Sequence, residues 1–201
     1  DPNSPHYLGE LISGAAIGAR TTESQTHPEM ASGLSMPVGF KNGTDGSLAT
    51  AINAMRAAAQ PHRFVGINQA GQVALLQTQG NPDGHVILRG GKAPNYSPAD
   101  VAQCEKEMEQ AGLRPSLMVD CSHGNSNKDY RRQPAVAESV VAQIKDGNRS
   151  IIGLNQSSEE PRSEITYCVS VTDACISWEM TDALLREIHQ DLNGQLTARV
   201  A

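Results

Sequence analysis

The sequence predicts an α/β protein with a parallel β-sheet. Short apolar runs alternate along the chain with longer segments of helical periodicity, an order typical of strand–helix–strand units with right-handed crossovers. Most runs are apolar at consecutive positions rather than at every second one, as in parallel strands covered on both faces. The chain has 201 residues, of which 38% are apolar, so it can fill a core of ordinary size.

Five segments are the predicted strands of this sheet. They are Leu11–Ala19, Met36–Phe40, His85–Gly90, Ser116–Ser122 and Ser150–Leu154. Because aromatic residues make up only 3% of the chain, Ala, Val, Ile, Leu and Met must supply most of the core between the strands and their helices.

Four segments have the pattern of helices. They are Gly46–Ala59, Pro98–Ala111, Pro134–Lys145 and Thr172 to about Leu192. Ser97 is a good N-cap for the second helix, with Pro98 in its first turn, and Gly112 and Gly147 are good helix ends. A further helical pattern, TTESQTHPEMASGL, is interrupted by Pro28, which would cost about 3 kcal/mol inside a helix. Either that helix begins late, with Pro28 in its first turn, or the identity of residue 28 is in doubt.

The segment His62–Asn81 interrupts the alternation of strands and helices. Its sequence, HRFVGINQAGQVALLQTQGN, predicts two strands that turn at Ala70–Gly71. This is an antiparallel hairpin inserted between two strand–helix units. Such an insertion suits a regulatory or subunit contact.

Charged or ligating residues directly follow four of the apolar runs: Arg20, Lys41, Arg89 and His123. In a parallel barrel the carboxyl ends of all strands lie on one face, where active sites are assembled. Arginine offers a planar fork to phosphate oxygens, lysine a compact charge for phosphate or carboxylate, and histidine a metal ligand or acid–base group. Each residue alone could be a solvated loop charge or a structural histidine. Their repeated position favours a shared binding site.

Composition excludes several other classes of protein. The net charge is −6 and the 16 Lys and Arg are scattered, which argues against nucleic acid or an anionic membrane as a partner. No apolar run approaches the ~20 residues of a membrane span, and DPNSPHYLGE lacks the features of a signal peptide. A nucleotide-binding glycine loop is also absent. Without CxxC spacing, the cysteines are expected to be reduced thiols of a cytoplasmic protein: Cys104, Cys121, Cys168 and Cys175.

Five motifs occur in order over essentially the whole chain: GAAIGARTTES, PVGFKNGT, ILRGGKAPNYS, DCSHGNSNK and VTDACISWE. Together they resemble class I 3-deoxy-D-arabino-heptulosonate-7-phosphate (DAHP) synthases, and the hairpin and C-terminal helix are most similar to the tyrosine-sensitive isoenzymes of enteric bacteria. The resemblance implies a TIM (β/α)8 barrel. Residues 1–201 would be the C-terminal portion of this single catalytic domain, with about five of its strands and the inserted hairpin at 62–81.

The resemblance also implies an activity. DAHP synthases are transferases that condense phosphoenolpyruvate with erythrose 4-phosphate to DAHP and phosphate, the first step of the shikimate pathway to aromatic amino acids. The enol carbon of phosphoenolpyruvate attacks the aldehyde, which a divalent metal ion such as Mn, Fe or Co polarises. A homodimer or homotetramer, inhibited by tyrosine, is implied as well.

Site residues are carried over motif by motif. Arg20 and Arg89 would bind the phosphate of phosphoenolpyruvate, close to the backbone of Gly18 and Ala19. Lys41 would lie against the carboxylate and phosphate end of this substrate. Cationic groups around two phosphorylated substrates would hold the reacting carbons together against their repulsion.

The implied metal site is incomplete in this sequence. His123 and Asp173 match two of the family's four metal ligands, and Lys41 and His123 its catalytic groups. The family's metal-binding cysteine and its lysine–proline–arginine–threonine motif for the sugar phosphate are absent. About nine residues, with a metal-binding glutamate, are missing at Leu154–Asn155, either deleted or unobserved, and Cys168 stands where glycine is expected. We therefore expect these 201 residues by themselves to be inactive.

Three positions match the family's effector site: Ser35, Phe64 and Gly66. Because Gly66 has no side chain, a pocket there would leave room for a phenol hydroxyl, which favours tyrosine over phenylalanine. The alternative is that Gly66 only eases a twisted or bulged strand.

Two other functions stay open. One is a non-catalytic remnant that binds phosphate or an aromatic amino acid. The other is a related phosphoenolpyruvate-condensing synthase, such as the one that makes the octulosonate sugar of bacterial lipopolysaccharide. The motifs GARTTES, KNGTDGS and GGKAPNYS fit that second enzyme less well.

Overall fold

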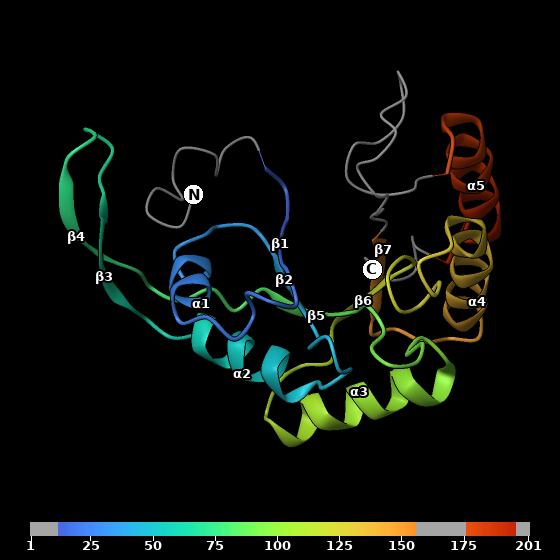
Figure 1. The fold of residues 1–201 in the computed structure, drawn as a ribbon, viewed down its shortest axis with the longest axis horizontal. Helices are drawn as coiled ribbons and strands as arrows, with labels where there is room; N and C mark the ends of the chain where they lie inside the picture. Colours follow the sequence, from blue (N-terminus) through green and yellow to red (C-terminus); the bar gives the residue numbers. More distant parts are fainter. Residues whose placement is uncertain (1–11, 156–175, 196–201) are drawn as a thin grey trace.

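The computed structural model describes residues 12–155 and 176–195. Its strands are β1 (Ala15–Ile17), β2 (Val38–Lys41), β3 (Arg63–Ile67), β4 (Val73–Gln77), β5 (Gly84–Leu88), β6 (Leu117–Asp120) and β7 (Ile151–Asn155). Its helices are α1 (Thr26–Ala31), α2 (Ala49–Ala58), α3 (Pro98–Gln110), α4 (Gln133–Lys145) and α5 (Trp178–Asp191). Figure 1 shows α1 to α4 following one another around the outside of the sheet, while the hairpin β3–β4 projects away from it.

Five strands form one parallel sheet in the order β1-β2-β5-β6-β7, and β3 and β4 pair antiparallel by themselves. All predicted strands and the hairpin are thereby confirmed. In the described residues the sheet is open, with β1 and β7 at its edges, and no closed barrel is formed. β1 is shorter than predicted because the backbone turns at Gly18, whose carbonyl accepts hydrogen bonds from the amides of Thr21 and Thr22.

The core lies between the sheet and the helices. Alternate strand residues are buried there: Ile17, Val38, Phe40, Val86, Leu88, Leu117, Val119 and Ile151. Each large apolar side chain buried in this way contributes about 1.5–3 kcal/mol. Because successive side chains of a strand point to opposite faces, Lys41, Arg89 and Asp120 lie on the other face. The packing of the core therefore decides which polar residues face the site.

Local sequence signals explain where the helices begin. Ser97 and Asp100 form a capping box at the start of α3, each side chain accepting a hydrogen bond from the other residue's amide. Pro28 lies in the first turn of the short helix α1, so the late start is confirmed. The predicted start of the last helix at Thr172 was too early, because Ser177 is extended and caps α5 at the amide of Met180. Residues 172–175 lie outside the described ranges.

No helix within the described ranges is long and apolar enough to cross a membrane. Cys104 and Cys121 are free and buried, whereas Cys168 and Cys175 lie outside the described part of the chain. Burial raises the pKa of both buried thiols to about 12, with nearby carboxylates acting in the same direction.

We expect Cys104 and Cys121 to resist alkylation in the native protein. With a pKa of about 12, only about one thiol in 10⁴ is ionised at pH 8, and the thiolate is the reactive form. Iodoacetamide labelling at pH 8, followed by peptide mass spectrometry, should modify both cysteines only after unfolding in guanidinium. Equal labelling rates in native and unfolded protein would contradict this burial.

Candidate active site

A cavity of about 350 Å³ lies at the carboxyl ends of the strands. It is lined by Gly18, Ala19, Arg20, Thr21, Lys41, Thr44, Arg89 and His123. The structure thus brings together all four residues predicted from the strand ends, together with the predicted backbone at positions 18 and 19. The convergence follows from the parallel order of β1, β2, β5 and β6, which places their carboxyl ends on one rim.

Arg20 and Arg89 supply two cationic groups to this cavity. Arg20 is exposed and Arg89 is partly buried, and within the described ranges neither guanidinium forms an ion pair. Arg20 lies in the turn after β1, which the Thr22 hydroxyl ties to the carbonyl of Lys41 at the end of β2. Two unpaired arginines at one cavity can bind a phosphate by several charge-assisted hydrogen bonds.

Lys41 and His123 share one oxygen of a buried carboxylate. Asp120 Oδ2 lies 2.7 Å from Lys41 Nζ and 2.9 Å from His123 Nδ1, and Asp120 Oδ1 accepts a hydrogen bond of 2.9 Å from the amide of Ser122. The side chain of Asp120 has 0% exposure, against 12% for Lys41 and 15% for His123. Asp120 was not among the site residues predicted from the sequence. The sequence feature that could have indicated this residue is an acidic side chain at the end of the apolar run LMVD.

Asp120 stays ionised despite its burial. Burial by itself raises the pKa of this carboxyl group, but the hydrogen bond from His123 and the charge of Lys41 outweigh it, so the net pKa is lowered. The site therefore holds a fixed negative charge behind Lys41. A buried pair of this kind stabilises a protein little by itself, although the loss of one partner is costly.

Three asparagines connect the loops that carry the site, and none of them was predicted from the sequence. The Asn42 side chain donates to the carbonyl of Gly90 and accepts from the amide of Arg89. Asn95 accepts from the amide of Gly90 and donates to Asn42, and its own amide donates to Asn125. These bonds hold the ends of β2, β5 and β6 in a fixed arrangement.

Comparison with known proteins assigns the chain to a family. Residues 1–186 match the DAHP synthetase I family. The chain belongs to this family. It is 91% identical over 210 residues to the Tyr-sensitive phospho-2-dehydro-3-deoxyheptonate aldolase of Escherichia coli K12, an alignment that covers 100% of this chain and 59% of that protein. The Tyr-sensitive aldolase of Enterobacter agglomerans is 80% identical, over 100% of this chain and 99% of its own length.

A solved structure agrees with this assignment. The phospho-2-dehydro-3-deoxyheptonate aldolase of Francisella tularensis SCHU S4 superposes with a TM-score of 0.85 at 40% identity, over 94% of this chain and 57% of that one. The chain thus spans little more than half the length of this relative and of the Escherichia coli one. The 210 aligned residues exceed the 201 of this chain by nine, the number expected to be missing after Leu154.

Within the described residues of this DAHP synthetase I family member, His123 is the candidate metal ligand. His123 Nδ1 forms a hydrogen bond with the Asp120 carboxylate, which makes Nε2 the candidate ligand atom. Such a carboxylate–histidine pair is typical of metal sites. Within residues 12–155 and 176–195, no group of three or more His, Cys, Asp or Glu side chains could hold a metal ion. Asp173, the second predicted ligand, lies outside these ranges. Cys121 is buried with a raised pKa, which suits packing rather than ligation.

The predicted effector residues lie on β3 of the hairpin and in the loop after α1. Phe64 and Gly66 are on the same face of β3, partly buried and buried respectively, and Ser35 is exposed in the loop after α1. The end of α1 contacts the hairpin through a hydrogen bond of 2.7 Å between the Ser32 and Thr78 hydroxyls. The strand pairing continues through Gly66 without a shift of register, so the bulge proposed as an alternative is absent.

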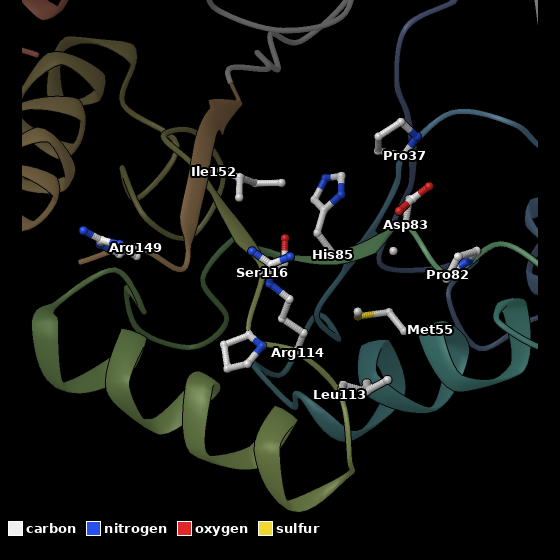
Figure 2. A pocket seen from close by; sticks show the side chains of 12 residues that line it. Pro37, Met55, Pro82, Asp83, His85, Leu113, Arg114, Ser116, Arg149 and Ile152 are labelled. Carbon is white, nitrogen blue, oxygen red and sulfur yellow. The ribbon is translucent and has the colours of Figure 1, made fainter. Parts of the chain in front are cut away.

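A second cavity, of about 340 Å³, lies at the amino ends of the strands (Figure 2). Figure 2 shows the His85 ring between Ile152 and Asp83, with the Arg114 side chain extending toward Ser116. His85 is 5% exposed, its Nδ1 has no hydrogen-bond partner in the described residues, and burial lowers its pKa. None of the predicted site residues lines this cavity, so the rim at the carboxyl ends is the candidate active site.

Proposed function

We propose that this chain belongs to a tyrosine-sensitive DAHP synthase (EC 2.5.1.54), which condenses phosphoenolpyruvate with erythrose 4-phosphate. The observation that carries the proposal is the convergence of Arg20, Lys41, Arg89 and His123 on one cavity. The high identity to Tyr-sensitive aldolases supports it. Residues 1–201 would then be the C-terminal portion of a TIM-barrel catalytic domain, whose remaining strands pair with the open edges at β1 and β7.

In the proposed reaction, Arg20 and Arg89 bind the phosphate of phosphoenolpyruvate and Lys41 faces its carboxylate. Their charges offset the repulsion between two phosphorylated substrates, so that the enol carbon and the aldehyde carbon can approach. The reaction forms the bond between these carbons and, with water, releases inorganic phosphate. His123 would be one ligand of a divalent metal ion, which supplies Lewis acidity when bound.

An activity assay of the purified full-length protein, of which these 201 residues are a part, tests this function. We expect release of phosphate and formation of DAHP from phosphoenolpyruvate and erythrose 4-phosphate, dependent on Mn²⁺, Fe²⁺ or Co²⁺. A five-carbon aldose phosphate, which would give an eight-carbon product, should react far more slowly. Preference for the five-carbon sugar would favour the related synthase, and binding of phosphoenolpyruvate without turnover would favour the non-catalytic remnant.

The position of Gly66 gives a prediction for inhibition by tyrosine. Replacing Gly66 with serine fills the volume proposed for the phenol hydroxyl, and we expect the tyrosine concentration for half inhibition to rise at least about tenfold, equivalent to about 1.4 kcal/mol. Ala70→Ser is the matched control, because Ala70 lies exposed in the turn of the same hairpin, outside the face that carries Gly66. Unchanged tyrosine inhibition in Gly66→Ser would reject Gly66 as a specificity residue.

The hairpin also supports the proposed homodimer or homotetramer. Val65, Val73 and Leu75 are 67%, 75% and 69% exposed and share one face of β3–β4, so a subunit contact would remove this apolar surface from water. We expect Val65→Lys and Leu75→Lys together to lower the oligomeric state measured by analytical ultracentrifugation. The same assembly in the double variant and in the unaltered protein would exclude this face as the contact.

A further inference from the structure

We infer that Asp120 is a positioning residue of this site: a single buried carboxylate holds Lys41 and His123 in the geometry that binding requires. The inference rests on the proposed function for the identity of what these two residues bind. Neither side chain is held in place by its own backbone alone. Lys41 has a long side chain at the end of β2, and His123 lies in the loop after β6. The common neighbour that restrains both is Asp120 Oδ2, at 2.7 Å and 2.9 Å.

The orientation of Asp120 is itself fully determined. Its backbone is the last position of β6, where it pairs with Asn155 of β7. Its Oδ1 accepts from the Ser122 amide, and its carbonyl accepts from the Asn125 side chain at 2.8 Å. With 0% side-chain exposure, no water competes for the remaining oxygen.

The loop conformation brings His123 back to this carboxylate. His123 has φ 52°, in the left-handed region that few non-glycine residues adopt, although histidine does so more often than most. This turn places the ring against the residue three positions earlier. Because Nδ1 donates to the carboxylate, the neutral ring carries its lone pair on Nε2, which makes Nε2 the candidate ligand atom for a cation.

Lys41 is held on the other side of the same oxygen. The carboxylate keeps the ammonium group at the wall of the cavity that Arg20 and Arg89 also line. Since both partners share Oδ2, a change at Asp120 must affect the cation site and the anion site together. This joint effect separates the proposed role from that of a residue serving only one of them.

The test replaces Asp120 with asparagine in the full-length protein. An amide NH₂ in place of Oδ2 cannot accept from Lys41 or His123. We expect the Kd for Co²⁺, measured by its visible absorption, to rise about 10–100-fold, with a rise in the KM for phosphoenolpyruvate. In metal-free protein, ¹⁵N NMR of His123 should show a protonated Nδ1 in the unaltered chain and loss of that preference in the variant. Asp129→Asn is the control, because Asp129 pairs with Arg131 and Arg132 at the surface and does not line the rim cavity.

Two results would overturn the role of Asp120. One is a folded Asp120→Asn variant whose Kd for Co²⁺ stays within about twofold of the unaltered protein. The other is a neutral His123 protonated on Nε2 in the unaltered protein, a measurement that holds even if the variant fails to fold. Neither the Kd for Co²⁺ nor the tautomer of His123 requires turnover. A protein that shows the expected tautomer and the expected rise in Kd but has no activity would therefore refute the proposed synthase activity and leave this inference standing.

Discussion

Replacement of Lys41 with methionine is expected to lower kcat/KM for phosphoenolpyruvate by about 10³-fold, the upper range for the loss of one preorganised electrostatic group. Methionine keeps an unbranched side chain only one atom shorter but removes the charge that faces the substrate. It also leaves the buried Asp120 carboxylate without its cationic partner, at a cost of up to roughly 3 kcal/mol of stability. Phosphate release should be assayed below the unfolding transition of the variant, as measured by circular dichroism.

Lys106→Met is the control for this variant. Lys106 is exposed on α3, away from the rim cavity. Its replacement with methionine causes the same change of net charge without altering the site. We expect its kcat/KM to stay within about twofold of the unaltered enzyme. A Lys41→Met variant that is folded and fully active would remove Lys41 from the proposed mechanism.

Replacement of Gly90 with alanine is expected to destabilise the protein by roughly 2–5 kcal/mol. Gly90 has φ 74°, and a Cβ there would lie 2.6 Å from the backbone carbon of Gly124, where neither loop can yield easily. The amide of Gly90 also donates to Asn95, so a shift would move the adjacent Arg89. Urea unfolding measures the loss of stability, and the KM for phosphoenolpyruvate measures the displacement of the site.

Gly112→Ala separates the two causes of this loss. Gly112 has the same φ of 74°, but among the described residues no atom beyond its two chain neighbours lies within 4 Å of the position of a Cβ. Alanine there carries only the left-handed conformational penalty of about 1–2 kcal/mol. Equal losses at the two positions would show that the loops at Gly90 and Gly124 do not approach each other as described.

Much of the fold could be predicted because its signals are local. The consecutive apolar residues of HVILRG and SLMVDCS indicate strands covered on both faces, and they became β5 and β6 in a parallel sheet. The capping residue Ser97 begins α3 by a bond to a residue only three positions away. The rim of Arg20, Lys41 and Arg89 could be anticipated as well, because the direction of parallel strands is enough to place their ends together.

By itself, then, the sequence determined the strands, the hairpin, most helix boundaries and the set of charges at one end of the sheet. Only the tertiary structure decided how these charges are held. Asp120 lies 79 positions from Lys41, and Asn42 lies 48 positions from the Gly90 carbonyl that it binds. Such hydrogen bonds form between residues at the ends of different strands, which are distant in the chain but lie close together in the sheet, so no local pattern records them. They exist because burial in the folded sheet removes water and leaves these polar groups only one another as partners.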